Sequence, residues 1–172
     1  MIEENIIHDG HFKVVQRESE RGTYDIVRTK NAASMLYIDT DDNVYLVRQF
    51  REPMEQEIFE LPAETIDKEG KTALEIMVEG LEEECGVRIE HDQVKHLTTI
   101  FSSPGYSTEL VDLFYATGDH IKTQQADFDV DNISVVTMPF NEAYGMIGEG
   151  KIQCAKSIIL LQNEYIRRKI NN

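Results

Sequence analysis

The first third of the chain alternates between apolar and polar residues in short runs, as antiparallel strands with one buried face do. Two turn sequences, Glu20-Arg21-Gly22 and Asp41-Asp42-Asn43, interrupt the alternation. Residues of these types are common where the backbone reverses direction. We therefore predict two successive hairpins, with strands at residues 12–17, 24–28, 33–38 and 44–50.

The rest of the chain divides between further apolar strands and runs with the period of a helix. The pattern predicts strands at residues 58–62, 94–101, 110–117 and 133–138, and helices at 141–147 and 154–170. A length of 172 residues suits one compact domain, and no repeat or linker divides it. Strands and helices must then share one core, in an α/β or α+β sandwich.

A further helix is predicted over residues 72–86. Thr72 and Glu75 have the spacing of a capping box, and Gly86 supplies the stop signal. Between them, one apolar stripe is expected to face the core, formed by Leu74, Met77, Val78, Leu81 and Cys85.

The opposite surface of this helix is strongly acidic. It carries Glu75, Glu79, Glu82, Glu83 and Glu84, with no lysine or arginine between them. Like charges four positions apart disfavour a helix, so we expect a cation to offset the repulsion. Glu83 and Glu84 are suited to Mg²⁺, which is often held by one or two carboxylates together with substrate phosphates. The simpler alternative is a solvated acidic face.

The composition narrows the classes of partner. The formal net charge of −15 opposes binding to a phosphate backbone, and no basic stripe is present, so nucleic acid is not an expected partner. No apolar run is long enough for a membrane span and residues 1–8 lack a signal-peptide core, so we expect a cytoplasmic protein. Cys85 and Cys154 are expected to be reduced core residues, with a redox pair as the alternative.

Four segments resemble, in their order along the chain, the motifs of one enzyme family. Residues 60–67 (ELPAETID) through 81–87 (LEEECGV) resemble the Nudix box, G-x5-E-x7-R-E-U-x-E-E-x-G-U with U aliphatic. Residues 47–53 (VRQFREP), 103–109 (SPGYSTE) and 150–157 (GKIQCAKS) are similar to three further segments of ADP-ribose pyrophosphatases. These are the strand before the box, the downstream SPG loop and the start of the last helix. The resemblance covers nearly the whole chain.

The resemblance implies an α/β fold in which a mixed sheet lies between helices, with an N-terminal antiparallel strand extension. Residues 1–172 would form a single Nudix domain, with the box loop and helix at 60–87. Residues 1–30 would form the N-terminal strands through which family members usually form a homodimer. The implied reaction is Mg²⁺- or Mn²⁺-dependent hydrolysis of a nucleoside diphosphate sugar, ADP-ribose in particular, to AMP and ribose 5-phosphate.

The chain departs from the family pattern at four positions. Glu64 stands where the box has its first glycine, and Lys71 where it has its first glutamate once one extra loop residue is allowed. The Arg-Glu pair of the box reads Glu79-Gly80, so one metal-ligating glutamate of the family is missing. Glycine inside a helix costs about 1 kcal/mol relative to alanine, so Gly80 indicates either lost function or a site opened for a different ligand.

Candidate site residues follow from the resemblance. The metal would be held by Glu83 and Glu84, with help from the Ala63 carbonyl and from Glu79 as a substitute. Glu83 and Glu84 would be catalytic, and so would a general base, Glu109 or one of Asp127, Asp129 and Asp131. Substrate contacts are expected from five residues: Arg48, Arg51, Ser103, Pro104 and Gly105. For each arginine, a surface ion pair is the alternative, although a planar guanidinium suits phosphate.

Two other functions compete with hydrolysis. A catalytically impaired Nudix domain could bind or sense ADP-ribose or a related nucleotide, and Gly80 favours this alternative. Against it, the one domain uses the whole of the 172 residues and leaves no separate output segment. A purely structural subunit should have lost Arg51, Glu83 and Glu84 together, yet all three are present. We therefore favour the enzyme.

Overall fold

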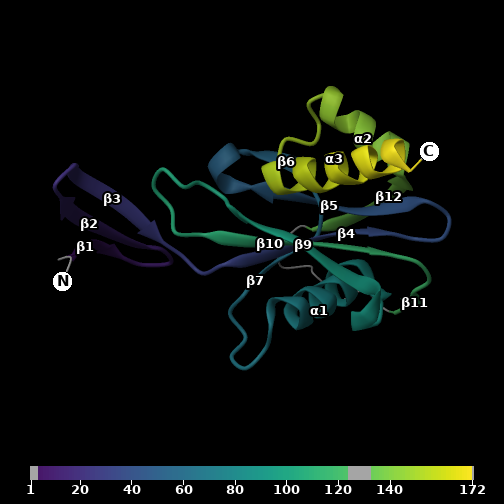
Figure 1. The fold of residues 1–172 in the computed structure, drawn as a ribbon, viewed down its shortest axis with the longest axis horizontal. Helices are drawn as coiled ribbons and strands as arrows, with labels where there is room; N and C mark the ends of the chain where they lie inside the picture. Colours follow the sequence, from purple (N-terminus) through teal and green to yellow (C-terminus); the bar gives the residue numbers. More distant parts are fainter. Residues whose placement is uncertain (1–3, 124–132, 172) are drawn as a thin grey trace.

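The structure, a computed structural model, describes residues 4–123 and 133–171 of the chain (Figure 1). A central sheet of seven strands has the order β12-β5-β4-β10-β9, with β6 paired to β5 and β7 paired to β4. Its strands are β4 (Ala32–Ile38), β5 (Asn43–Arg51), β6 (Gln56–Glu60), β7 (Ala63–Thr65), β9 (Val94–Phe101), β10 (Leu110–Thr117) and β12 (Ser134–Pro139).

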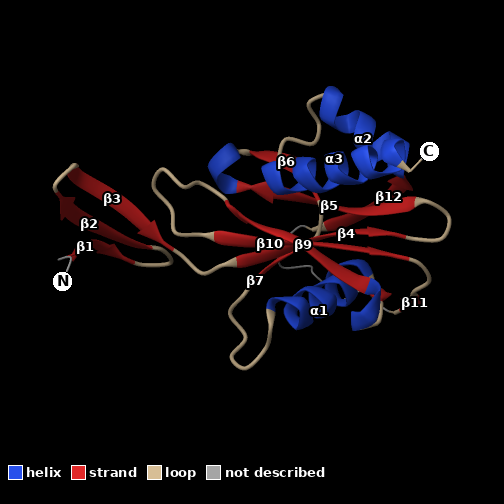
Figure 2. Ribbon diagram, in the orientation of Figure 1, coloured by secondary structure: helices blue, strands red, loops and turns tan. Residues whose placement is uncertain are grey.

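Helices cover both faces of this sheet. Helix α1 (Ala73–Cys85) lies on one side, and α2 (Phe140–Gly148) and α3 (Ala155–Ile170) lie on the other (Figures 1 and 2). Strand β4 runs parallel to β10, whereas the other pairings within the sheet are antiparallel. The expected α/β fold, a mixed sheet between helices, is confirmed.

Strand β4 explains why the core has two halves. Leu36 and Ile38 pack with the helices α2 and α3, whereas Met35 and Tyr37 pack with α1. Successive side chains of a strand point to opposite faces, so a strand covered on both sides must be apolar throughout. This accounts for the four consecutive apolar residues 35–38 in the segment that we interpreted as a hairpin strand.

The second expected hairpin forms only in part. Strands β4 and β5 are joined by one ladder pair, Ile38 with Val44. At its start, β4 instead pairs with β7, which places Glu64 opposite Ala33. Strand β7 is too short for its alternation to be recognised in the sequence. Its pairing fixes the box loop against the middle of the sheet, beside α1.

A separate antiparallel sheet projects from one end of the molecule (Figure 1). The predicted hairpin is present as β2 (Lys13–Ser19) and β3 (Gly22–Arg28), and β1 (Glu4–Asp9), which we did not predict, pairs with β2. This sheet is tied to the β9–β10 loop, since the Val27 amide donates to the Tyr106 carbonyl at 2.7 Å. The small strands β8 (Val87–Arg88) and β11 (Ile121–Lys122) pair with each other, and short 3₁₀ turns cover Glu52–Met54 and His91–Gln93.

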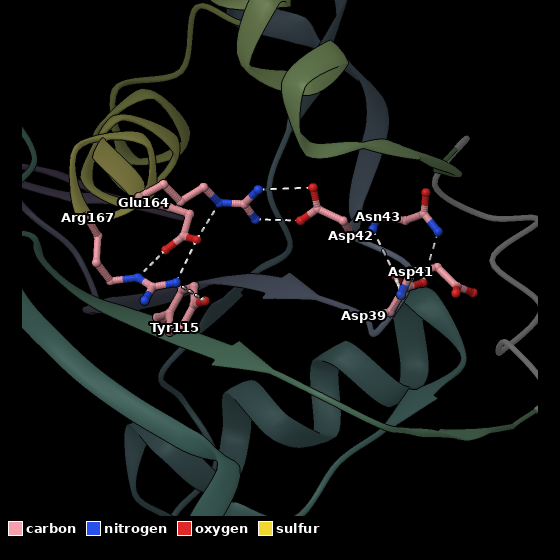
Figure 3. A network of polar contacts seen from close by, with 8 residues as sticks. Asp39, Asp41, Asp42, Asn43, Tyr115, Glu164 and Arg167 are labelled. Atoms are coloured by element: carbon pink, nitrogen blue, oxygen red, sulfur yellow. Dashed lines mark hydrogen bonds and ion pairs between the residues drawn. The ribbon is translucent and has the colours of Figure 1, made fainter. Parts of the chain in front are cut away.

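The end of α3 is anchored by a polar network (Figure 3). The Glu164 carboxylate is almost completely buried and accepts hydrogen bonds from Arg167 and Arg168 at 2.6–2.8 Å. Arg168 also donates to Asp42, in the turn before β5. The basic residues in the last turn of α3 therefore also hold this helix to the sheet. None of the helices in the described ranges has the length and apolarity needed to cross a membrane.

Candidate active site

Helix α1 begins and ends as its sequence predicts. The Thr72 hydroxyl accepts from the Glu75 amide at 3.3 Å, and the Glu75 carboxylate accepts from the Thr72 amide at 2.7 Å. Gly86 ends the helix in the left-handed conformation, with φ of 65°. Met77, Val78 and Leu81 are buried against the sheet, and this packing turns the acidic surface of the helix toward the box loop.

Cations from outside the helix neutralise part of this acidic surface, as we expected. Glu79 binds two lysines of the box loop, Lys68 at 3.1 Å and Lys71 at 2.5 Å. Glu82 binds Arg88 at 2.6 Å, just beyond the helix. Lys71, which stands at the position of the first box glutamate, thus partners Glu79. The carboxylate that we considered as a substitute metal ligand is already held by two ammonium groups.

The last two glutamates of the helix are less well satisfied. Glu83 is half exposed, and its nearest cation, Lys68, is 3.8 Å away. Glu84 is turned inward, and its Oε2 is buried without a hydrogen-bond partner among the described residues. Burial raises the pKa of Glu84 to about 8, and the nearby charge of Glu64 adds to this effect. A buried carboxylate oxygen without a donor is costly, so this atom has free capacity for a cation.

The Glu64 side chain of strand β7 lies directly over Gly80 of helix α1. A Cβ atom added to Gly80 would lie less than 3.0 Å from Oε1, Cγ and Cδ of Glu64, which is closer than real Cβ atoms approach other atoms. Burial raises the pKa of Glu64 to about 7, and repulsion from Glu83 contributes. The site therefore gathers Glu64, Glu83 and Glu84.

The chemistry of these residues suits a hard divalent cation, because all of their ligating atoms are oxygens. One of these atoms, Oε2 of Glu84, is buried without a hydrogen-bond partner among the described residues. Within the described residues, no three acidic, histidine or cysteine side chains already converge as a complete metal cage. That agrees with the usual habit of Mg²⁺, which keeps waters and shares substrate phosphates with one or two carboxylates.

Beside the carboxylates lies a cavity of about 900 Å³, at the upper end of the usual range for small-molecule sites. It combines aromatic, cationic and acidic side chains. His11 and Phe12, from the turn between β1 and β2, also contribute, so the projecting sheet forms part of its wall. Its aromatic and charged lining includes Phe12, Phe101, Lys30, Arg51, Lys156, Glu64, Asp67 and Glu109.

A buried carboxylate holds two of the cavity's cations. Glu60 accepts from Arg51 at 2.7 Å and from Lys156 at 2.7 Å. Attraction to Lys156 and Arg51 outweighs desolvation and keeps the pKa of Glu60 below its ordinary value. Arg51 remains partly exposed to the cavity, whereas Lys156 is largely buried. The Lys156 ammonium also donates to Cys154 at 3.0 Å, and both cysteines are free thiols.

The predicted site residues divide into two groups. Arg51, Ala63 and Glu109 line the cavity, whereas Glu79, Glu83 and Glu84 of α1 are not part of its lining. Arg48 lies outside it and contacts Glu57 at 3.7 Å and Ser134 at 3.3 Å. Odd spacing along one strand puts Arg48 and Arg51 on opposite faces, a signal that was available in the sequence.

In the β9–β10 loop, Ser102 lines the cavity, whereas Ser103, Pro104 and Gly105 do not. The alternative bases Asp127, Asp129 and Asp131 lie outside the described residues. The residues near the site that were not predicted include Phe12, Lys30, Glu60, Glu64, Phe101 and Lys156. For Glu64, the sequence contained a signal. A glutamate stands at position 64, where the box has glycine, and a glycine stands at position 80, where the box has glutamate.

The fold is also that of a solved structure described as an ADP compounds hydrolase. The two superpose with a TM-score of 0.77 over 97% of this chain and 93% of that one, at 17% sequence identity. No family model matches the sequence.

Curated relatives cover most of the chain. A methanol dehydrogenase activator of Bacillus methanolicus is 31% identical over 139 residues, which is 80% of this chain and 74% of the relative. A GDP-mannose pyrophosphatase of Yersinia enterocolitica is 32% identical over 154 residues, covering 85% and 78%. An ADP-ribose pyrophosphatase of Bacillus subtilis is 26% identical over 146 residues, covering 84% and 76%. Together with the acidic helix and its flanking motifs, these similarities establish that the chain belongs to the Nudix hydrolases of the ADP-ribose pyrophosphatase kind.

Proposed function

We propose that this protein hydrolyses the diphosphate bond of a nucleoside diphosphate sugar, with Mg²⁺ or Mn²⁺ as cofactor. ADP-ribose is the first candidate substrate, and water addition would release AMP and ribose 5-phosphate. The observation that carries the proposal is that an acidic residue of the proposed metal site also faces the cavity: Glu64 lines it together with Arg51 and Glu109. Relatives named for ADP-ribose and GDP-mannose pyrophosphatase activity support the same substrate class.

The lining of the cavity suits the parts of such a substrate. Phe12 and Phe101 are exposed aromatic side chains that offer flat faces for a nucleobase. The Arg51 guanidinium can donate two hydrogen bonds to a phosphate while Glu60 fixes its orientation. Lys30 also lines the cavity and adds a second positive charge. The cavity lining therefore offers aromatic faces for the base and cationic groups for the diphosphate.

The carboxylates would hold the metal and manage the proton of the attacking water. Glu83 and Glu84 are the proposed ligands from α1, and the Ala63 carbonyl is a further proposed ligand. A bound Mg²⁺ or Mn²⁺ would neutralise the diphosphate and lower the pKa of the attacking water. Glu109 lines the same cavity and is the described candidate for the proton acceptor.

The decisive experiment is turnover of ADP-ribose, ADP-glucose, GDP-mannose and UDP-glucose with Mg²⁺ or Mn²⁺. Alkaline phosphatase would release inorganic phosphate from the monoester products but not from the intact diphosphates. We expect cleavage of at least one compound, abolished by EDTA. A protein that is folded, binds these compounds in a thermal-shift assay and cleaves none of them would contradict the proposal.

That contrary outcome would support the second candidate function, a nucleotide-binding protein that acts on another protein. The observation in its favour is the relative named as a methanol dehydrogenase activator, a name that describes an effect on another enzyme. The two functions are compatible in one chain, so activity and binding should be measured on the same preparation.

We also propose that the protein is a homodimer formed through the projecting β1–β3 sheet. This sheet stands away from the central body (Figure 1) and exposes Ile6, Ile7 and Tyr24 to 53%, 51% and 44%. Exposed apolar side chains on an unpacked sheet are typical of an interaction surface. The turn of the same sheet reaches the cavity through His11 and Phe12, so association there would affect the site.

A further inference from the structure

We propose that Glu64 supplies the carboxylate that helix α1 lacks at Gly80, a proposal that rests on the metal site proposed above. In this chain, the glycine and the glutamate of the box have exchanged places between strand β7 and helix α1. The site would then be built from two elements, with Glu64 on one side and Glu83 and Glu84 on the other. Glu64 becomes a metal-binding residue that the family pattern alone would not identify.

The first support is steric. Atoms of the Glu64 side chain occupy the space that any side chain at position 80 would need, and its Oε1 lies nearest. Both residues are held in place by regular structure: Glu64 pairs with Ala33 in the sheet, and Gly80 is buried within a 13-residue helix. The carboxylate therefore enters the same region from the opposite wall.

The second support is that the other acidic residues nearby are already engaged. Glu75 caps the helix, Glu79 binds Lys68 and Lys71, and Glu82 binds Arg88. Among the ion pairs of the described residues, none includes Glu64 or Glu84. Glu84 Oε2 is buried without a donor. A cation is the partner that would satisfy both carboxylates at once.

The two substitutions also depend on each other. In its present conformation the Glu64 side chain leaves no room for a side chain at position 80, and glycine at 80 leaves space that the Glu64 side chain fills. Glutamate at 64 without glycine at 80 would produce a steric overlap. Glycine at 80 without glutamate at 64 would leave the site one carboxylate short. Their joint presence preserves one carboxylate at the site, which argues against Gly80 as a mark of decay.

The test is Mn²⁺ binding by the full chain without nucleotide, measured by titration calorimetry and by the loss of the free-ion electron paramagnetic resonance signal. We expect Glu64→Gln to weaken Mn²⁺ binding by roughly 10- to 100-fold, the usual range for a disturbed metal site. The exchange variant Glu64→Gly with Gly80→Glu should recover most of the affinity. Glu82→Gln, which removes a neighbouring carboxylate bound by Arg88, is the matched control and should bind as wild type does.

The outcomes separate this inference from the proposed function. If the wild-type protein cleaves no nucleotide sugar but Glu64→Gln still weakens Mn²⁺ binding, the reaction is wrong and the ligand assignment stands. Unchanged Mn²⁺ affinity in Glu64→Gln would overturn the assignment even in an active hydrolase. Failure of the wild-type protein to bind Mn²⁺ at millimolar concentration would overturn it as well. Circular dichroism of each variant verifies that the fold is retained.

Discussion

The Glu60 carboxylate accepts a hydrogen bond of 2.7 Å from the Lys156 ammonium, 96 positions later in the chain. This contact joins the end of β6 to the first turn of α3 at the edge of the cavity. Glu60 also fixes Arg51, the arginine that we propose binds the substrate phosphate. One buried carboxylate thus supports both the packing of the last helix and the orientation of a binding residue.

Replacing Glu60 with glutamine should therefore destabilise the protein and impair substrate binding. Loss of the carboxylate leaves the Lys156 ammonium buried without its counter-charge, and removing one partner of a buried pair costs about 3 kcal/mol or more. Urea unfolding followed by circular dichroism measures this. The control is Glu57→Gln, since the exposed pair with Arg48 is worth less than about 1 kcal/mol. Equal stability of the two variants would contradict the prediction.

Glu84→Gln should remove metal-dependent turnover while leaving the fold intact. The substitution keeps the shape of the side chain but replaces a group that can ionise on binding a cation with a neutral amide, at a position where one oxygen is buried without a partner. We expect kcat/KM to fall by more than about 100-fold, the upper end of the loss that disturbed partners of metal ligands cause. Assays with ADP-ribose across a Mg²⁺ titration measure this. Undiminished activity would eliminate Glu84 from the site.

The contact between Glu64 and Gly80 predicts a non-additive pair of substitutions. Gly80→Ala alone should displace the Glu64 side chain, because the new methyl group overlaps with it. In a Glu64→Gly background the same change should stabilise the helix by about 1 kcal/mol, the ordinary advantage of alanine over glycine. Thermal unfolding of the wild type, both single variants and the double variant completes the cycle. Equal effects of Gly80→Ala in both backgrounds would show that the residues do not interact.

The stability of the metal-free protein should decrease as the pH rises from about 5 to about 8.5. The pKa values of Glu64 and Glu84 in the folded protein are about 7 and about 8, above the ordinary 4.5. Folding therefore favours their protonated forms. This contribution is complete below the pKa of the unfolded chain and is lost as the pH passes through the folded pKa values.

Melting temperatures across this range, with and without Mn²⁺, test the pH prediction. Mn²⁺ should restore stability at the alkaline end, because binding to the native state alone stabilises it. The Glu64→Gln, Glu84→Gln double variant should show a flatter profile. A metal-free wild-type protein that becomes more stable over the same range would rule out the assigned pKa shifts.

The proposed homodimer predicts a mass of about twice 19.8 kDa in light scattering. Replacing Ile6 and Ile7 with serine should shift the mass toward the monomer, because it removes apolar surface from the projecting sheet. Ile170→Ser, which replaces a still more exposed isoleucine at the end of α3, serves as the control. A wild-type protein of monomeric mass would remove this proposal.

Much of the architecture could be predicted from local sequence. The box helix has its capping residues at Thr72 and Glu75 and its stop at Gly86, and these act through neighbouring backbone groups. The apolar periods gave strands β2, β9 and β10 and helix α3 within a few residues. Strand β7 could not be found this way, because three residues are too few to establish a period and pairing with β4 determines their conformation.

The family, the acidic helix and four candidate site residues, Arg51, Glu83, Glu84 and Glu109, were predicted from residue types and their spacing. Which of the acidic residues are bound by cations, and which remain available for a ligand, depends on how the helices and strands pack together. The structure also shows that Glu64 and Gly80, which both differ from the family pattern, lie in contact with each other. The physical reason is that these two residues belong to different elements. The distance between the Glu64 side chain and Gly80 therefore depends on how β7 packs against α1, which no local sequence pattern predicts.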